Sequence, residues 1–339
     1  MDLKNLTLKQ KILQMFITGF NGKNFAANDY FAEMLHSGLG GVIFFTHNIE
    51  TEKQFRDLIS DISYNAKIPL FLSIDQEGGR VERTEKIHNG KKYLSAKSAC
   101  DMGLSYLQNQ TKEIALELKG YGINMNFAPV LDVNTNKNNP IIGERAFSDN
   151  PDEVISAGKL VIKEYEKYNI IPVAKHFPGH GDADADSHKT LPVINLPKEE
   201  LENIHIKPFE EAVKINVPAI MCAHVLYPAL DDSNIPASVS YKIINDILIK
   251  QLGFTGVIMT DDMDMNGIKV MTRLEACTKA INAGVNMFIF RDTTKEIYTL
   301  VQDIETAVKQ GLIDENKINE SVEKIFNLKR RFGIIQQAD

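Results

Sequence analysis

The segment 171–192, IPVAKHFPGHGDADADSHKTLP, concentrates side chains that are capable of chemistry. It follows a short apolar run and contains one lysine, three histidines and three aspartates: Lys175, His176, His180, His188, Asp182, Asp184 and Asp186. A histidine two residues after an aspartate, as in Asp186-Ser187-His188, can be oriented by that carboxylate and can exchange protons near neutral pH. The pair favours general acid–base chemistry, although an isolated Asp-x-His motif more often lies in a solvated polar loop.

Two other segments place carboxylates at the ends of apolar runs. In 256–265, GVIMTDDMDM, Asp261 can serve as a base, a metal ligand or a covalent nucleophile, and capping of the following helix is the structural alternative. In 73–83, SIDQEGGRVER, Asp75 can accept two sugar hydroxyls, and Arg80 and Arg83 can donate to a carbonyl or carboxylate. A structural Arg–Asp pair explains the second segment equally well. Arg145, in the loop segment GERAF, indicates by itself only a surface residue.

Metal binding is the main competing chemistry for the histidines and aspartates. His176 and His180 are four residues apart, but a Pro-Gly pair at 178–179 breaks the helix that would place both on one face. The run 182–186, DADAD, lacks the turn glycine and the closing glutamate of an EF-hand loop. We therefore predict no metal site, and we expect His176 and His180 to shape the loop and bind substrate.

Eight short apolar runs predict the strands that position these side chains. They lie at 14–20, 41–46, 69–75, 124–130, 171–176, 219–224, 256–261 and 286–290. Apolar residues at helical spacing predict helices at 52–65, 98–119, 151–168, 199–215, 241–251, 272–283, 295–310 and 315–331. Uniformly apolar strands that alternate with helices predict an α/β fold, a single (β/α)8 TIM-type barrel domain over residues 1–339. The alternative, a doubly wound open sheet, lacks its GxGxxG motif.

The position of polar residues in these runs supports the barrel. Residues capable of chemistry lie at the carboxyl ends of the predicted strands: Asp75, Asp132, Lys175, His176, His224, Asp261, Asp262 and Arg291. In barrels this end is the catalytic face. Contact of strand ends with solvent explains one or two such residues, but not this many.

The composition of the chain limits its partners. A net charge of −7 disfavours nucleic acid, and none of the apolar runs among the 339 residues is long enough to span a bilayer. The three cysteines lie far apart, which predicts no disulfide framework and suits a reducing cytosol. The N-terminal apolar run resembles a signal peptide only superficially. We expect a cytoplasmic monomer with a small-molecule substrate and with neither a nucleic-acid nor a membrane partner.

In combination, IDQEGGRV, KHFPGHG with the following DSH, and GVIMTDDM resemble the family 3 glycoside hydrolases. The resemblance is strongest to their single-domain bacterial β-N-acetylglucosaminidases, which recycle peptidoglycan. It covers the chain from about residue 14 to residue 330, with the motifs in family order. It implies a barrel that hydrolyses terminal N-acetylglucosaminides with retention of configuration, without a cofactor or metal.

The resemblance also implies roles for individual residues. Asp261 matches the nucleophile that forms the glycosyl-enzyme, and His188, oriented by Asp186, matches the general acid and base. The substrate-binding positions of the family match Asp75, Arg83, Arg145, Lys175 and His176. The Gly- and Ala-rich loop 177–188 is expected to move between open and closed forms.

Other functions stay open on the sequence. A histidine repels phosphate less than a carboxylate does, so an N-acetylglucosaminide phosphorylase on the same scaffold is an alternative, and a metal-dependent hydrolase is another. A non-catalytic sugar-binding barrel requires the loss of Asp261 or His188, and both are present. The leaving group, an anhydro-muropeptide, a muropeptide or a chitin oligomer, is left undetermined.

Overall fold

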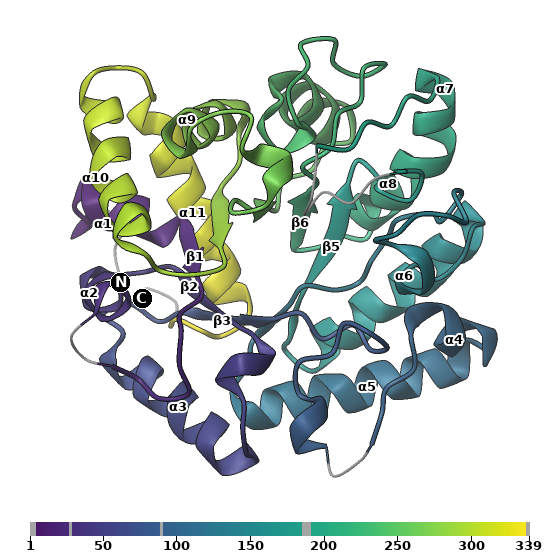
Figure 1. Cartoon of the computed structure of the whole chain (residues 1–339), viewed down its shortest axis with the longest axis horizontal. Helices are drawn as coiled ribbons and strands as arrows, with labels where there is room; N and C mark the ends of the chain where they lie inside the picture. Colours follow the sequence, from purple (N-terminus) through teal and green to yellow (C-terminus); the bar gives the residue numbers. More distant parts are fainter. Residues whose placement is uncertain (1–4, 27–28, 89–90, 185–190, 337–339) are drawn as a thin grey trace.

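The computed structural model describes residues 5–26, 29–88, 91–184 and 191–336. In this part of the chain eight parallel strands form a closed barrel, in which each strand pairs with the next and β8 (Met287–Phe290) pairs with β1 (Phe16–Thr18). Helices surround the strands on the outside (Figure 1). The predicted (β/α)8 barrel is confirmed.

All eight predicted strands are present, and most are shorter than the apolar runs that predicted them. The remaining strands are β2 (Gly41–Phe44), β3 (Phe71–Ile74), β4 (Met125–Asn126), β5 (Ile171–Phe177), β6 (Ala219–Cys222) and β7 (Val257–Asp262). The largest difference is in β4, because Pro129 has no N–H to donate to a sheet. The chain beyond β4 still follows β5, since Leu131 N–H donates to the carbonyl of Lys175.

Five predicted helices begin and end within one residue of the structure: α3 (Glu52–Asn65), α6 (Pro151–Lys167), α9 (Arg273–Ala283), α10 (Lys295–Lys309) and α11 (Glu315–Arg331). The predicted helix 98–119 is wrong as one element, because Gly103 at φ 98° separates α4 (Ala96–Asp101) from α5 (Leu104–Tyr121). The predicted helix 199–215 consists of α7 (Lys198–Glu200), π-helical turns and α8 (Lys207–Lys214), and Lys242–Gln251 is also π-helical.

Two short helices, α1 (Leu8–Gln14) and α2 (Tyr30–Ser37), were not predicted. The apolar residues of α1 run directly into β1, so its periodicity merges with that of the strand. None of the helices in the described ranges combines the length and the apolarity needed to cross a bilayer.

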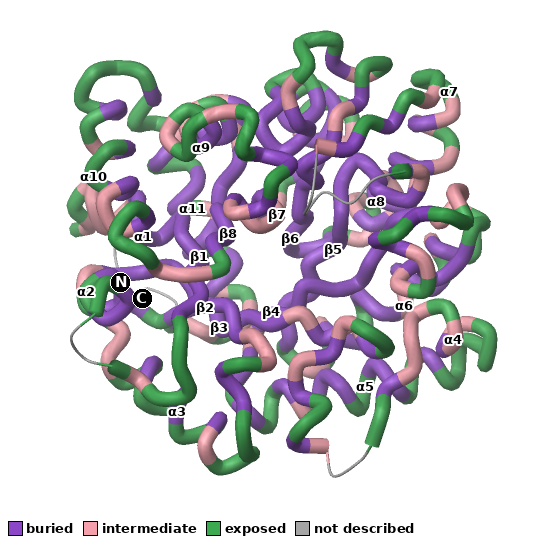
Figure 2. The backbone as a smooth tube through the Cα atoms, in the orientation of Figure 1, coloured by how far each residue is buried: buried purple, intermediate pink, exposed green. Residues whose placement is uncertain are grey.

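The strands and much of the inner sides of the surrounding helices are buried (Figure 2), and most of their buried apolar side chains form one large cluster. All seven residues of β5 are buried, and two of them, Lys175 and His176, are ionisable. Buried ionisable groups require compensating partners, because burial otherwise disfavours their charged forms. The partners of these two residues define the site described next.

Candidate active site

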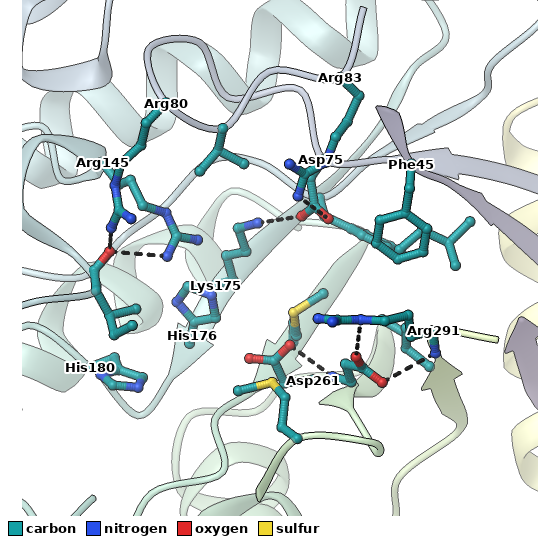
Figure 3. A pocket seen from close by; sticks show the side chains of 18 residues that line it. Phe45, Asp75, Arg80, Arg83, Arg145, Lys175, His176, His180, Asp261 and Arg291 are labelled. Carbon is teal, nitrogen blue, oxygen red and sulfur yellow. Dashed lines mark hydrogen bonds and ion pairs between the residues drawn. The ribbon is translucent and has the colours of Figure 1, made fainter. Parts of the chain in front are cut away.

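A cavity of about 170 Å³ lies at the carboxyl ends of the strands (Figure 3). Six residues that the sequence identified as site candidates line it: Asp75, Arg83, Arg145, Lys175, His176 and Asp261. The other two, Asp186 and His188, lie outside the described residues. Residues far apart in the sequence, such as Asp75 and Asp261, therefore meet at the face where barrels carry their active sites.

Lys175 is the central cation at the floor of this cavity. Its side chain is only 2% exposed, and Nζ lies 2.8 Å from Asp75 Oδ1 and 2.6 Å from Glu77 Oε1. Burial lowers the pKa of Lys175, but these two carboxylates raise it further, so that the net shift is upward and the ammonium is retained. Lys175 can donate hydrogen bonds to a polar ligand while it holds Asp75 in place.

Glu77 is the residue that the sequence analysis missed. Its carboxylate accepts from Arg145 Nε at 2.8 Å and Nη2 at 2.9 Å, a bidentate geometry, in addition to its contact with Lys175. Burial raises the pKa of Glu77, but Arg145 and Lys175 together hold it well below its ordinary value. The interpretation of Arg145 as an isolated surface residue is wrong, because its side chain is 11% exposed and is paired. Its charge points toward the cavity floor.

A hydrogen bond to Asp132 orients His176. Asp132, which is fully buried, accepts from His176 Nδ1 at 2.7 Å and from the backbone N–H of His180 at 2.7 Å. Because Nδ1 is engaged with the carboxylate, Nε2 of His176 is the ring atom left to face the cavity. Burial lowers the pKa of His180 to about 4, so His180 is neutral near pH 7.

Asp261 faces the cavity from the end of β7 (Figure 3). Its Oδ1 accepts from the backbone N–H of Asp262 at 2.8 Å. Burial raises the pKa of Asp261, but electrostatic interactions with His176 and His224, the Asp262 hydrogen bond and Lys175 lower it to about 2. The carboxylate is therefore ionised at neutral pH. The helix-capping alternative is wrong, because α9 begins after Thr272, whose side chain accepts from the N–H of Glu275.

His224 forms a hydrogen bond with the last residue of β7. It is fully buried, and burial lowers its pKa. Nε2 donates to the carbonyl of Asp262 at 3.1 Å, and Nδ1 accepts from Ser238 Oγ at 2.6 Å. The hydrogen bonds fix the backbone that carries Asp261.

Arg83 closes one side of the cavity. Its Nη2 lies 3.6 Å from Asp75 Oδ2, and its guanidinium lies over the ring of Phe45 at 6.0 Å from the centroid. The structural Arg–Asp pair considered for this segment is therefore present, and the same two side chains also line the cavity. In the described ranges no group of three or more His, Cys, Asp or Glu side chains is arranged to hold a metal ion.

The described start of loop 177–188 is tightly packed. Tyr227 Oη donates to the carbonyl of Gly179 at 2.8 Å, and Asn139 Nδ2 donates to that of His180 at 2.9 Å. A Cβ on Gly181 would lie 1.8 Å from the carbonyl oxygen of Val133. Only glycine fits there, so the chain is held firmly at the point where it enters residues 185–190.

Comparison with known proteins agrees with this arrangement. Residues 7–328 match the glycosyl hydrolase family 3 N-terminal domain. Beta-hexosaminidase A of Pseudoalteromonas piscicida is 33% identical over 86% of this chain, and the match spans 53% of that relative. The beta-hexosaminidase of Nitrosomonas eutropha is 30% identical, with 87% of each chain covered. The chain thus spans about half the length of the first relative and most of the second.

A solved structure is similar over nearly the whole chain. The family 3 β-N-acetylglucosaminidase from Paenibacillus sp. FPU-7 superposes with a TM-score of 0.91 at 34% identity, covering 98% of this chain and 64% of that one. A cavity lined by charged side chains at the carboxyl ends of the strands is the usual place of an active site in a parallel barrel. The chain belongs to the family 3 glycoside hydrolases. The relatives described above are named β-hexosaminidases or β-N-acetylglucosaminidases.

Proposed function

We propose that this protein is a retaining exo-β-N-acetylglucosaminidase that removes terminal non-reducing N-acetylglucosamine from muropeptides. The observation that carries the proposal is the ionised Asp261 carboxylate, which faces the pocket that Lys175, Asp75 and His176 line. A sugar that is bound by Lys175, Asp75 and His176 presents its ring to Asp261. The hexosaminidase names of the relatives support N-acetylglucosamine as the sugar.

In the proposed mechanism Asp261 attacks the anomeric carbon while His188, oriented by Asp186, protonates the leaving oxygen. His188 then deprotonates water, which attacks the glycosyl-enzyme and releases the sugar with retained configuration. A carboxylate with a pKa of about 2 needs no proton removed before it attacks at neutral pH. The roles of Asp186 and His188 rest on the sequence resemblance, because both lie outside the described residues.

The floor of the cavity supplies the proposed contacts to the sugar. Asp75, Lys175 and His176 would hold its hydroxyl groups, and Arg83 and Arg145 would hold the acetamido side. Every one of these side chains already has a partner of opposite charge or an aromatic neighbour, which limits its motion before substrate arrives. Such preorganisation lowers the entropy that is lost when substrate binds. The single-domain organisation, the monomeric state and the cytoplasmic location stay predictions.

The proposal is tested with Asp261→Asn, which keeps the shape of the side chain and removes the nucleophile. We expect turnover of an aryl N-acetylglucosaminide to fall by at least about 1,000-fold, with the thermal unfolding curve unchanged in shape. Substantial residual activity contradicts the assignment of the nucleophile. For the native protein, NMR of the first product is expected to show the β-anomer. A sugar 1-phosphate formed only in the presence of phosphate would instead indicate the phosphorylase.

A further inference from the structure

Arg291 differs from the other cations of the cavity in its exposure and its pairing. It directly follows β8, and its side chain is 57% exposed, against 2% for Lys175, 11% for Arg145 and 25% for Arg83. Figure 3 shows it beside Asp261, on the side of the cavity nearest Phe45. Arg291 therefore lies toward the solvent, while Lys175 and Arg145 lie at the floor.

In the described residues, the guanidinium of Arg291 is paired only through Nε. Nε lies 3.3 Å from Asp262 Oδ2, and the backbone N–H of Arg291 donates to Asp262 Oδ1 at 3.2 Å. Within the described part of the chain the terminal Nη groups make no further hydrogen bond. In contrast, Lys175 and Arg145 are enclosed by Asp75 and Glu77. The contacts with Asp262 thus fix the direction of the Arg291 side chain and leave its Nη groups available as donors.

The lining of the cavity carries charges of both signs. It includes five Lys and Arg side chains, Arg80, Arg83, Arg145, Lys175 and Arg291, and three Asp side chains, Asp75, Asp261 and Asp262. Glu77 pairs with Lys175 and Arg145 beneath this lining, so these two cations are compensated, and the exposed Arg291 is the cation placed to meet a ligand.

We propose that Arg291 determines specificity for leaving groups that carry a carboxylate. The inference rests on the proposed function, which places the bound sugar at the cavity floor and its anomeric carbon at Asp261. The leaving group must then extend from Asp261 toward solvent, past Arg291. A guanidinium with two available Nη donors binds a carboxylate in a bidentate, charge-assisted manner, and it makes only a weaker hydrogen bond to a neutral ester carbonyl.

The test compares four disaccharide substrates that share a terminal N-acetylglucosamine. In the first substrate the leaving sugar carries a free lactyl carboxylate, and in the second it carries the methyl ester of that carboxylate. In the third the lactyl group forms an amide with a peptide that has carboxylates of its own, and the fourth, chitobiose, has no lactyl group. The measured quantity is the ratio of kcat/KM for each substrate to kcat/KM for chitobiose. We expect the native protein to prefer a carboxylate-bearing substrate to the ester by about tenfold at low salt.

Arg291→Gln is expected to bring that preference to about one, and Arg291→Lys is expected to retain part of it. The matched control is Arg56→Gln, which removes the same charge from the exposed outer face of α3 and is expected to keep the full preference. Preference for the peptide-bearing amide over the ester would locate the recognised carboxylate in the peptide, and preference for the free lactyl acid alone would locate it on the sugar. Either preference supports the assignment of Arg291 if Arg291→Gln abolishes that preference.

Two results overturn the inference. In one, the native protein hydrolyses acid and ester equally, a measurement that needs no variant. In the other, Arg291→Gln lowers kcat/KM for all four substrates by the same factor. If the protein hydrolysed neither the four disaccharides nor an aryl N-acetylglucosaminide, the proposed function would be refuted instead.

Discussion

Glu77→Gln tests whether the carboxylate beneath the cavity holds the site together. The substitution keeps the size of the side chain and removes its charge. In the native protein this carboxylate, which is 4% exposed, is shared by Lys175 at 2.6 Å and by Arg145 at 2.8 and 2.9 Å. The variant leaves Asp75 as the remaining carboxylate in contact with Lys175, and it leaves the Arg145 guanidinium without its bidentate partner.

The expected cost follows from burial. Removing one partner of a buried ion pair costs about 3–5 kcal/mol, because the remaining charge is left uncompensated. The amide of glutamine keeps one oxygen acceptor, so we expect the lower end, about 3 kcal/mol of unfolding free energy at pH 7. The pKa of Glu77 is lowered in the folded state, so its contribution is fully present above the unfolded pKa of about 4.3 and is lost progressively as the pH falls from that value toward the much lower folded pKa.

Urea unfolding at pH 7 and at pH 4 measures this difference between native protein and variant. The control is Glu211→Gln, which removes a carboxylate that also contacts two lysines, Lys159 and Lys214, but on the outer surface. We expect the control to change the unfolding free energy by less than about 1 kcal/mol. KM for an aryl N-acetylglucosaminide should rise only in the Glu77 variant. A loss below about 1 kcal/mol in that variant at pH 7 would refute the reasoning.

Three further outcomes are expected. Burial lowers the folded pKa of Lys329 to about 7, so the unfolded chain binds one more proton than the folded chain between about pH 7 and pH 10. The unfolding free energy of the native protein, relative to that of Lys329→Met, should therefore rise by roughly 2–4 kcal/mol across that window. A difference in urea unfolding that does not change with pH would contradict this. Gly181→Ala should reduce kcat/KM by about tenfold or more through its clash with Val133, whereas Gly120→Ala, which meets nothing closer than 3.6 Å, should leave it unchanged. Dialysis against a chelator should leave turnover unaltered, and a loss restored by added metal would favour the metal-dependent hydrolase.

The strands and the face that carries the site could be predicted because their signals are local. A barrel strand is buried on both sides, so it appears as a short apolar run, and the residue at its end faces the cavity. Asp75, Lys175, His176 and Asp261 were identified in this way, and the cavity contains all four. Helix breaks at Gly103 and the π-helical turns were missed, because the apolar spacing continues through them.

Glu77 shows the limit of local signals. In the sequence it is one acidic residue in a turn, two positions after Asp75. Its importance arises only when the β3 loop, β5 and the turn that carries Arg145 meet, joining residues 68 positions apart. The same holds for Asp132, which was noted only as a strand end and is the partner of His176.

The amino-acid sequence by itself determined the barrel, the order of its strands and the types of side chain at their carboxyl ends, because periodicity and residue type are properties of short segments. Only the tertiary structure decided which charges neutralise one another. Lys175 and Arg145 share Glu77 at the floor, and Arg291 pairs with Asp262 and keeps an exposed side chain. Pairing depends on distances of a few ångströms between distant segments, and burial then sets how strongly each pair shifts a pKa.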